Sequence, residues 1–255
     1  MSEPKVFTAC LIIIGNEVLS GRTRDANLQF LATGLNAIGI RMTEARVIPD
    51  VEETIIANVN ECRAKFDYVF TTGGIGPTHD DITSASVAKA FGVELIRHPD
   101  ADARLKRHYK PEDINPQRMK MADVPEGATL IDNPVSAAPG FRVGNVFVLP
   151  GVPRIMQAMF DGMKHTLMGG APVLSCAIAC HVQEGTLAEG LARVQADFPD
   201  VEIGSYPFFR HGKLGVALVL RTPDKARLDL AAEKVEALIR AKGGEPMEDR
   251  PPEAG

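Results

Sequence analysis

The sequence predicts an α/β protein in which a doubly wound, mostly parallel sheet is followed by a smaller α+β domain. Strand-like apolar runs alternate with amphipathic segments through the first two-thirds of the 255 residues, an order that places helices on both faces of a parallel sheet. The run "VFTACLIII" from Val6 is apolar throughout, as strands covered on both faces are. After "MGGAP" at 168–172 the order of elements changes. We therefore predict domains at 1–170 and 171–244, and a disordered tail at 245–255 because that segment is polar and rich in proline.

Four strand–helix pairs are predicted in the first domain. Gly92 is placed to end a helix as a left-handed residue, and Asp50 and Glu53 have the spacing of a capping box. In the first helix an apolar face recurs at Leu28, Leu31, Leu35 and Ile38. The predicted strands are 6–14, 40–48, 67–72 and 145–150, and the predicted helices are 25–39, 50–66, 80–92 and 152–167.

The second domain is predicted as a small α+β unit. Thr186 and Glu189 have capping-box spacing at the start of its first helix. "GKLG" at 212–215 has the GxxG spacing of an RNA-gripping loop, but it falls between two strands and therefore predicts a hairpin turn. The last helix has an apolar stripe at Leu228, Ala231, Ala232, Val235, Leu238 and Ile239. The predicted strands are 175–183, 201–208 and 214–222, and the predicted helices are 186–198 and 225–241.

Composition and charge argue against several kinds of partner. With a net charge of −5 and a pI of about 5.7, the chain as a whole does not attract nucleic acid or anionic membranes. The nine apolar residues from Val6 are too few to span a bilayer. Cys176 and Cys180 lie four strand steps apart, roughly 13 Å, whereas disulfide-bonded Cα atoms lie within about 7 Å. We expect a cytoplasmic protein with reduced cysteines.

Glycine-rich or proline-rich loops follow three strands of the first domain, and a fourth such segment lies between two strands. Because the carboxyl ends of parallel strands meet at one edge of a sheet, we expect these segments to lie together and to form the ligand site. They are "GNEVLSGRTRD" at 15–25, "GGIGPTHDD" at 73–81, "NPVSAAPGF" at 133–141 and "PGVPR" at 150–154.

The loop at 73–81 contains opposing signals for an anionic ligand. Gly73, Gly74 and Gly76 permit close backbone approach, and the helix start that follows favours an anion by about 0.3–1 kcal/mol. Asp80 and Asp81 oppose it, since a carboxylate about 5 Å from a phosphate charge costs roughly 3 kcal/mol at an effective dielectric of about 20. A hard divalent ion held by the carboxylates and by the ligand's own phosphates removes the conflict. The alternative is that both aspartates cap the helix.

Other candidate residues each have a functional and a structural interpretation. Glu17, just past a strand end, is placed to contact a metal or a ligand hydroxyl, or is a surface carboxylate. Arg22 either forms an ion pair with a phosphate or is a solvated surface residue. Asn27 is either a helix cap or a ligand contact. Ser136 is a phosphate donor or a turn hydroxyl. His79 reads as an exposed loop residue and not as a general base.

Together the loops resemble the MoaB/Mog molybdopterin-binding superfamily, and most closely the amino-terminal part of the competence/damage-inducible protein A (CinA-like) family. The resemblance implies a three-layer α/β fold, a following KH-like unit, a pocket over 73–81 and a homo-oligomer, either dimer or trimer. It stops before the nicotinamide-nucleotide deamidase domain of longer relatives, so that activity is not implied. The matching stretches, within 6–168, are "GNEVLSGRTRDANLQFL", "TTGGIGPTHDDIT", "NPVSAAPGF" and "LPGVPRIM".

The resemblance implies roles for residues of the central loop. Asp80 and Asp81 would be metal- or phosphate-site residues, and the cradle would be Gly73, Gly74, Gly76 and Thr78. Asn16 and Ile155 stand where some relatives have carboxylates, which puts such roles at those positions in doubt. From their places in the loops, Glu17 is a third catalytic candidate, and the further ligand-binding candidates are Arg22, Asn27, Ser136 and Gly151.

Two branches of the superfamily imply different chemistry. One binds molybdopterin and includes an adenylylation step, whereas the other cleaves a diphosphate such as ADP-ribose or FAD with a divalent metal (Mg²⁺, Mn²⁺ or Co²⁺). The forms "GPTHDD" and "LPGVP" resemble the second branch. We therefore expect a metal-dependent pyrophosphatase acting on an ADP-ribose-like nucleotide diphosphate. The alternatives are a molybdopterin-binding or adenylyl-transferring protein and a non-catalytic, ligand-sensing regulatory dimer.

Overall fold

The computed structural model describes residues 5–210 and 212–248 of the chain. The chain divides into two compact units, residues 1–171 and 172–255, called below the first unit and the second unit. Within the described residues, no helix combines the length and the apolar character needed to cross a membrane.

The first unit is built on a six-stranded sheet with the order β2-β1-β3-β8-β7-β6. The first four of these strands run parallel. At one edge β7 pairs antiparallel with β8, and β6 pairs antiparallel with β7. The predicted mostly parallel sheet is confirmed. The strands are β1 (Phe7–Ile14), β2 (Ile40–Ile48), β3 (Tyr68–Thr72), β6 (Thr129–Ile131), β7 (Gly140–Val143) and β8 (Val146–Leu149).

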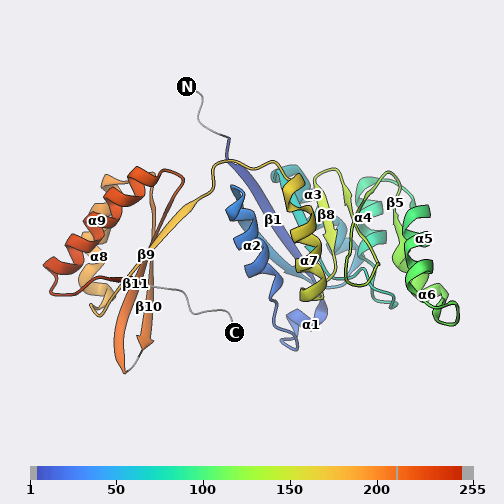
Figure 1. Cartoon of the computed structure of the whole chain (residues 1–255), viewed down its shortest axis with the longest axis horizontal. Helices are drawn as coiled ribbons and strands as arrows, with labels where there is room; N and C mark the ends of the chain where they lie inside the picture. Colours follow the sequence, from blue (N-terminus) through green and yellow to red (C-terminus); the bar gives the residue numbers. More distant parts are fainter. Residues whose placement is uncertain (1–4, 211, 249–255) are drawn as a thin grey trace. The chain divides into compact units, whose positions relative to one another are not determined.

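Helices cover both faces of this sheet (Figure 1). One face packs against α2 (Asn27–Ala37) and α7 (Pro153–Met163), which continues into the short turn η3 (Lys164–Thr166); the other packs against α3 (Glu52–Lys65) and α4 (Thr83–Phe91). Side chains of β1 alternate between the two layers and are buried in both, which explains why this strand is apolar throughout. Ala9, Leu11 and Ile13 face the first layer, and Cys10, Ile12 and Ile14 face the second.

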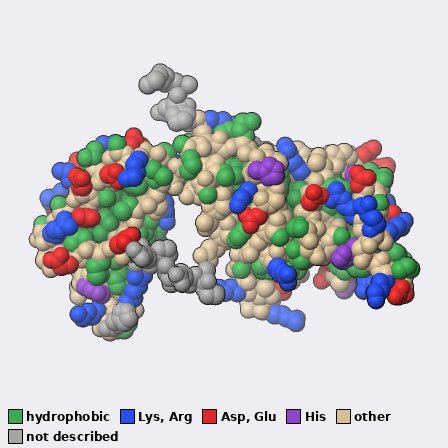
Figure 2. Space-filling model, in the orientation of Figure 1, with side chains coloured by type: hydrophobic (Ala, Val, Ile, Leu, Met, Phe, Trp, Pro, Cys, Tyr) green, Lys and Arg blue, Asp and Glu red, His purple; other side chains and the backbone are tan. Residues whose placement is uncertain are grey.

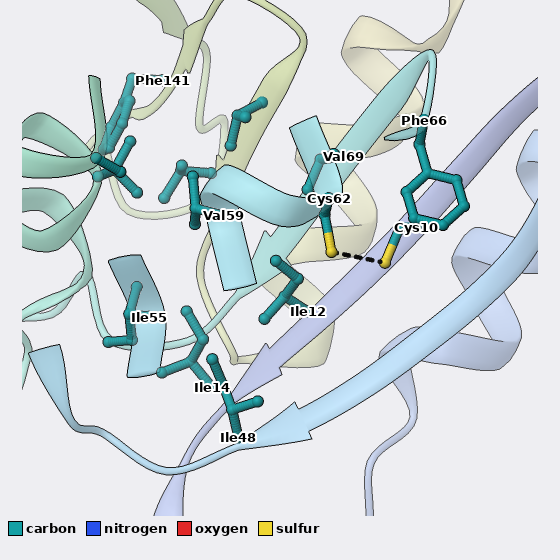
Figure 3. Close-up of a cluster of buried hydrophobic side chains, with 14 of the residues drawn as sticks. Cys10, Ile12, Ile14, Ile48, Ile55, Val59, Cys62, Phe66, Val69 and Phe141 are labelled. Atoms are coloured by element: carbon teal, nitrogen blue, oxygen red, sulfur yellow. Dashed lines mark hydrogen bonds between the residues drawn. The ribbon is translucent and has the colours of Figure 1, made fainter. Parts of the chain in front are cut away.

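Two cysteines meet in the buried layer beneath α3 (Figure 3). The Sγ atoms of Cys10 in β1 and Cys62 in α3 lie 3.6 Å apart, at hydrogen-bond distance, and neither side chain is exposed. The hydrogen bond to Cys62, together with burial, raises the pKa of the Cys10 thiol. All four cysteines of the chain are free, as the sequence predicts for Cys176 and Cys180.

The segment between α4 and β6 contains short elements that the hydrophobic pattern does not predict. β4 (Leu95–Arg97) and β5 (Asp123–Pro125) form an antiparallel ribbon, and α5 (Pro99–His108) lies between them in the chain. Strands of three residues are too short to show a period. A separate apolar cluster holds α5 against α6 (Pro116–Met119) and the turn η2 (Lys120–Ala122); it is formed by Ala101, Leu105, Met119 and Ala122. The turn η1 (Pro111–Asp113) lies between α5 and α6 in the chain.

Two predicted features of the first unit's helices are wrong. Asp50 does not cap α3, which begins after Val51, because its Oδ2 atom accepts the backbone N–H of Asn16 from a neighbouring loop at 2.8 Å. Leu28 is 36% exposed, since the buried face of α2 starts from Asn27 instead. Gly92 ends α4 with a φ of 68°, as predicted.

The second unit is a four-stranded antiparallel sheet of order β10-β11-β9-β12, packed on one side against α8 (Glu184–Asp197) and α9 (Lys225–Ala241). The apolar stripe of α9 is buried or half-buried as predicted, and Asp224 caps this helix. The predicted hairpin is confirmed, since β10 and β11 pair from Arg210 and Lys213 outward and Gly212 has a φ of 75°. The turn is shorter than predicted, because Lys213, Leu214 and Gly215 already belong to β11. The strands are β9 (Leu174–Cys180), β10 (Glu202–Arg210), β11 (Lys213–Thr222) and β12 (Met247–Glu248).

Two predictions for the second unit need correction. The capping box at Thr186 does not form: α8 begins at Glu184, and the Thr186 N–H donates to the Gln183 carbonyl within the first turn. The predicted disordered tail contains β12, whose Met247 and Glu248 pair with β9 and cover its free edge. Residues 249–255 of that tail lie outside the described residues.

Candidate functional site

The connection from β3 to α4 is a loop that only glycine can form at two positions. Gly73 has a φ of 102° and Gly74 a φ of 68°. A Cβ atom on Gly73 would lie 2.1 Å from the Ile14 carbonyl oxygen, and one on Gly74 would lie 2.1 Å from the Thr83 hydroxyl oxygen. Thr83 holds the turn, because its hydroxyl donates to the Gly73 carbonyl and its N–H donates to the Gly74 carbonyl. Residues 73–81 are called the glycine loop below.

The far end of the glycine loop is closed by Asp81 and Lys120. The Asp81 Oδ2 atom accepts the N–H of Thr78 at 2.8 Å and its hydroxyl at 2.5 Å. Lys120 in η2 donates to the backbone carbonyls of Thr78 at 2.9 Å and Asp81 at 2.8 Å. Gly76 packs against the Asp81 carboxylate, since a Cβ atom built on Gly76 would lie 2.7 Å from Asp81 Oδ2. No motif in the sequence points to Lys120.

The two aspartates are not helix caps, because α4 begins only at Thr83 and has no side-chain cap. The Asp81 carboxylate is hydrogen-bonded to Thr78 within the glycine loop, whereas the Asp80 side chain is 67% exposed. The Thr78 hydroxyl, followed by the backbone N–H of Asp80 itself, lowers the pKa of the Asp80 carboxyl, so this group is ionised at neutral pH. His79 is almost fully exposed, as its sequence context predicts. The loop therefore presents two neighbouring carboxylates beside its glycine turn.

The loop after β1 places Glu17 next to the same sheet edge. It includes the single turn α1 (Asn16–Leu19), and the Glu17 carboxylate folds back over Gly15, 2.5 Å from where a Cβ of Gly15 would be. Arg22 is exposed and has no polar partner among the described residues. Asp25 lies just before α2 and accepts the N–H of Leu28 in its first turn at 2.8 Å. Asp50, anchored to Asn16, adds a carboxylate here that the sequence does not assign to the site.

Asn27 links three of the predicted loops. It is only 2% exposed, and its Nδ2 donates to the carbonyl of Gly151 at 2.9 Å. Gly151 in turn lies against Gly73, whose Cα is 3.4 Å from where a Gly151 Cβ would be. The Oδ1 atom of Asn27 and the hydroxyl of Thr72 in β3 are both buried without a hydrogen-bond partner. Buried polar groups normally have a partner, so these two atoms at the sheet edge favour a bound ligand or water.

Ser136 belongs to a separate arrangement. Its hydroxyl accepts from Asn133 Nδ2 at 2.8 Å, and its N–H donates to Asn133 Oδ1 at 3.0 Å. Among the described residues it makes no hydrogen bond to the glycine loop. The structure thus joins the loops at 15–27, 73–81 and 151, and it leaves the ligand role of Ser136 as a prediction.

The donor set at the glycine loop fits a metal only together with a ligand. In the described part of the chain, no three His, Cys, Asp or Glu side chains lie close enough to hold an ion by themselves, so Glu17 does not join Asp80 and Asp81 in one ligand set. Two adjacent carboxylates suit an ion like Mg²⁺, which is held by one or two carboxylates plus substrate phosphates. The residues therefore fit a divalent ion that a diphosphate brings with it.

Comparison with known proteins identifies the two units separately. Residues 10–169 match the family model of a probable molybdopterin binding domain, and residues 172–246 match the model of the FAD synthase middle domain. A protein of Pyrobaculum calidifontis is 34% identical over 253 residues, which cover 92% of this chain and 97% of the relative. A CinA-like protein of Desulfosudis oleivorans is 33% identical over 247 residues, 91% of this chain and 59% of the relative.

One solved structure resembles the chain in both sequence and shape. It is described as the protein CinA with unknown function from Thermoplasma acidophilum, and it is 37% identical with a TM-score of 0.59. The match covers 62% of this chain and 96% of that one. The resemblance and the fold class predicted from the loops are confirmed.

Proposed function

Because the chain belongs to the family of probable molybdopterin binding domains and is CinA-like, we propose that it is a metal-dependent pyrophosphatase that cleaves an ADP-ribose-like nucleotide diphosphate. The observation that carries this proposal is the glycine loop, where a turn restricted to glycine lies beside two exposed or partly exposed carboxylates, Asp80 and Asp81. A loop that only needed to connect β3 to α4 would not require both features at once.

The charges of this loop select for a ligand that carries a cation. The start of α4 favours an anion by about 0.3–1 kcal/mol. Each ionised aspartate about 5 Å from a phosphate opposes it by roughly 3 kcal/mol at an effective dielectric of about 20. The carboxylates therefore outweigh the helix end, and a bare diphosphate is repelled. Asp80 and Asp81 would hold a divalent ion, which when bound neutralises the diphosphate and lowers the pKa of a water molecule.

The remaining residues bind and orient the ligand. The N–H of Gly73 is not free for the ligand, because it donates to the Leu149 carbonyl at 3.1 Å. The backbone N–H groups of Gly74 and Gly76 would stabilise the negative charge that develops on the diphosphate. Lys120 fixes the loop by its two bonds to backbone carbonyls. The unpartnered Oδ1 of Asn27 accepts a hydroxyl or N–H of the ligand, and the Thr72 hydroxyl donates to it. Glu17, at the neighbouring strand end, orients the attacking water or a ribose hydroxyl.

The test is release of AMP by the purified chain from ADP-ribose and from FAD, with Mg²⁺, Mn²⁺ or Co²⁺ added in turn. FAD is included because the second unit matches the FAD synthase middle domain. We expect metal-dependent release in the wild type and a loss of at least about 100-fold in Asp81→Asn. The amide oxygen of that variant can still accept the bonds from Thr78, so its melting temperature should stay within a few degrees.

Asp161→Asn is the matched control, because this exposed aspartate of α7 only pairs with Lys164 and removal of its charge should leave turnover unchanged. A wild-type rate in Asp81→Asn contradicts the catalytic role. A collapse of folding in the same variant would instead show that Asp81 serves the loop alone.

A second candidate is a molybdopterin-binding or adenylyl-transferring protein, which the family description of residues 10–169 favours. The same assay separates the two candidates. If no AMP is released with any of the three metals and a pterin binds tightly, the second function replaces the first.

A further inference from the structure

A cleft of about 470 Å³ lies between α5 and the segment 132–137, and the proposed pyrophosphatase activity does not use it. The helix contributes Arg104, Arg107 and His108, and the segment contributes Asp132, Asn133, Pro134 and Ala137. Its volume falls within the range of about 300–1,000 Å³ typical of small-molecule sites. The cleft shares no lining residue with the small cavity beside Gly76 and Asp81 at the glycine loop. We call it the α5 cleft.

The helix side of the α5 cleft is cationic. Arg107 and His108 lie three and four residues after Arg104, which places both next to it on one face of α5. Arg104 is hydrogen-bonded to Asp132, so the single carboxylate of the cleft is already neutralised. Arg107 is exposed and has no ion-pair partner among the described residues. Figure 2 shows lysine and arginine side chains gathered at the end of the first unit that carries α5.

Cations in the last turn of a helix are common because they complement its dipole. Lys106 illustrates that case, since it lies in the same turn and pairs with Asp102 at 2.7 Å on another face of the helix. The dipole alone does not explain why two arginines and a histidine line one cleft together. An anionic ligand would, because guanidinium groups bind phosphate through two parallel hydrogen bonds.

The opposite wall of the cleft is rigid. Asn133 uses both ends of its amide: Oδ1 accepts from the N–H groups of Val135 and Ser136, and Nδ2 donates to the Ser136 hydroxyl and to the Ala138 carbonyl. These bonds hold Ala137 at a φ of 61°, a left-handed conformation that an alanine adopts only at an energetic cost. Pro134 and Ala137 give this wall an apolar surface. A ligand here meets cations on one side and a preformed apolar surface on the other.

From this arrangement we infer that the α5 cleft binds a phosphomonoester of nucleotide size, with its phosphate on Arg107 and His108 and its organic part against Pro134 and Ala137. AMP has this chemistry whether it comes from the proposed reaction at the glycine loop or from elsewhere. The site is thus a second, separate binding site in the first unit.

Titration calorimetry with AMP, ribose 5-phosphate and adenosine tests the inference on the full chain. Both phosphates should bind with an affinity that falls as salt is added, and adenosine should not bind. Arg107→Glu should weaken AMP binding at least about tenfold. Lys234→Glu makes the same charge change at an exposed position of α9 and should leave the affinity unchanged.

Asp81→Asn distinguishes the two sites. If AMP binding survives in that variant and is weakened in Arg107→Glu, the α5 cleft is the site, whatever the outcome of the pyrophosphatase assay. If AMP binds to Arg107→Glu as to the wild type, or if adenosine binds as well as AMP, the inference is overturned.

Discussion

The two units of the chain treat buried polar groups differently. In the first unit, Asn27, Thr71 and Thr72 each bury a side-chain oxygen that has no hydrogen-bond partner. In the second unit, the buried polar side chain among the described residues is Thr222, whose hydroxyl accepts the N–H of Asp224. One positive-φ glycine turn from each unit shows a further contrast. A Cβ atom on Gly73 would meet backbone, whereas one on Gly212 would meet nothing within 4 Å.

This difference indicates where the two units are optimised for stability and where they are not. An unsatisfied buried hydroxyl or amide costs about 1–3 kcal/mol. Such groups persist in natural proteins mainly at functional sites, where a ligand supplies the missing partner. The second unit has an apolar core, the hydroxyl of its buried Thr222 has a hydrogen-bond partner, and it needs no ligand to explain it. The unpartnered buried groups at the carboxyl edge of the first unit's sheet, by contrast, are explained by a bound ligand.

Replacement of glycine by alanine should give the largest contrast. Gly73→Ala should destabilise the first unit by about 3 kcal/mol, because the methyl group meets the Ile14 carbonyl and the residue stays at positive φ. Gly212→Ala, also at positive φ but in open space, should destabilise the second unit by only about 1 kcal/mol. Hydrogen exchange followed by mass spectrometry reads the two units separately. Equal destabilisation by Gly73→Ala and Gly212→Ala would contradict the distinction between the packed glycine loop of the first unit and the open turn of the second.

Removal of a lysine should affect activity in the first unit only. Lys120→Met loses the two bonds that hold the Thr78 and Asp81 carbonyls, so AMP release from ADP-ribose should fall by about tenfold or more. Lys225→Met loses an exposed pair with Asp229 in α9 and should leave the rate unchanged. If Lys120→Met retains full activity while the fold is intact, the glycine loop does not depend on this anchor.

Threonine-to-valine changes should have opposite signs in the two units. Thr72→Val removes an unpartnered hydroxyl and should stabilise the first unit by about 1 kcal/mol while it raises KM for the diphosphate. Thr222→Val leaves the Asp224 N–H without its partner and should destabilise the second unit by about 1 kcal/mol. Chemical denaturation and kinetics measure both effects. Destabilisation by Thr72→Val would mean that the hydroxyl already has a partner in solution.

Most of the fold could be predicted from the sequence because its signals are local. The apolar run at 6–14, the helix face at Leu31 and Leu35, and the strand at 40–48 all coincide with elements of the structure. The glycine loop was predicted for the same reason, since positive φ at Gly73 and Gly74 is a property of single residues. The three-residue strands β4 and β5 are too short to show a period, and α5 was not predicted although Ala101 and Leu105 have helical spacing.

The parts of the site that could not be predicted depend on contacts between distant residues. Lys120 reaches Thr78 and Asp81 across 42 and 39 positions of the chain. Asp50 has the spacing of a cap, yet it bonds to Asn16, 34 positions away. The lack of a partner for Thr72 is a property of its packed surroundings and leaves no trace in sequence. Spacing rules describe local hydrogen bonds and cannot rank them against tertiary ones.

A fall in pH should lower the stability of both units, and the substitutions that test this have the smallest expected effect. The Lys5 ammonium, followed by the Thr8 N–H, lowers the pKa of Asp67 in the first unit, and the Arg227 guanidinium lowers the pKa of Asp200 in the second. A depressed carboxyl contributes stability above its unfolded pKa, near about 3.9, and that contribution is lost as the pH falls through the folded value. Asp67→Asn should therefore flatten the acid dependence of the first unit alone, and Asp200→Asn that of the second. Hydrogen exchange at neutral pH and below about pH 4 measures both, and a change in the wrong unit would show that the two units do not unfold independently.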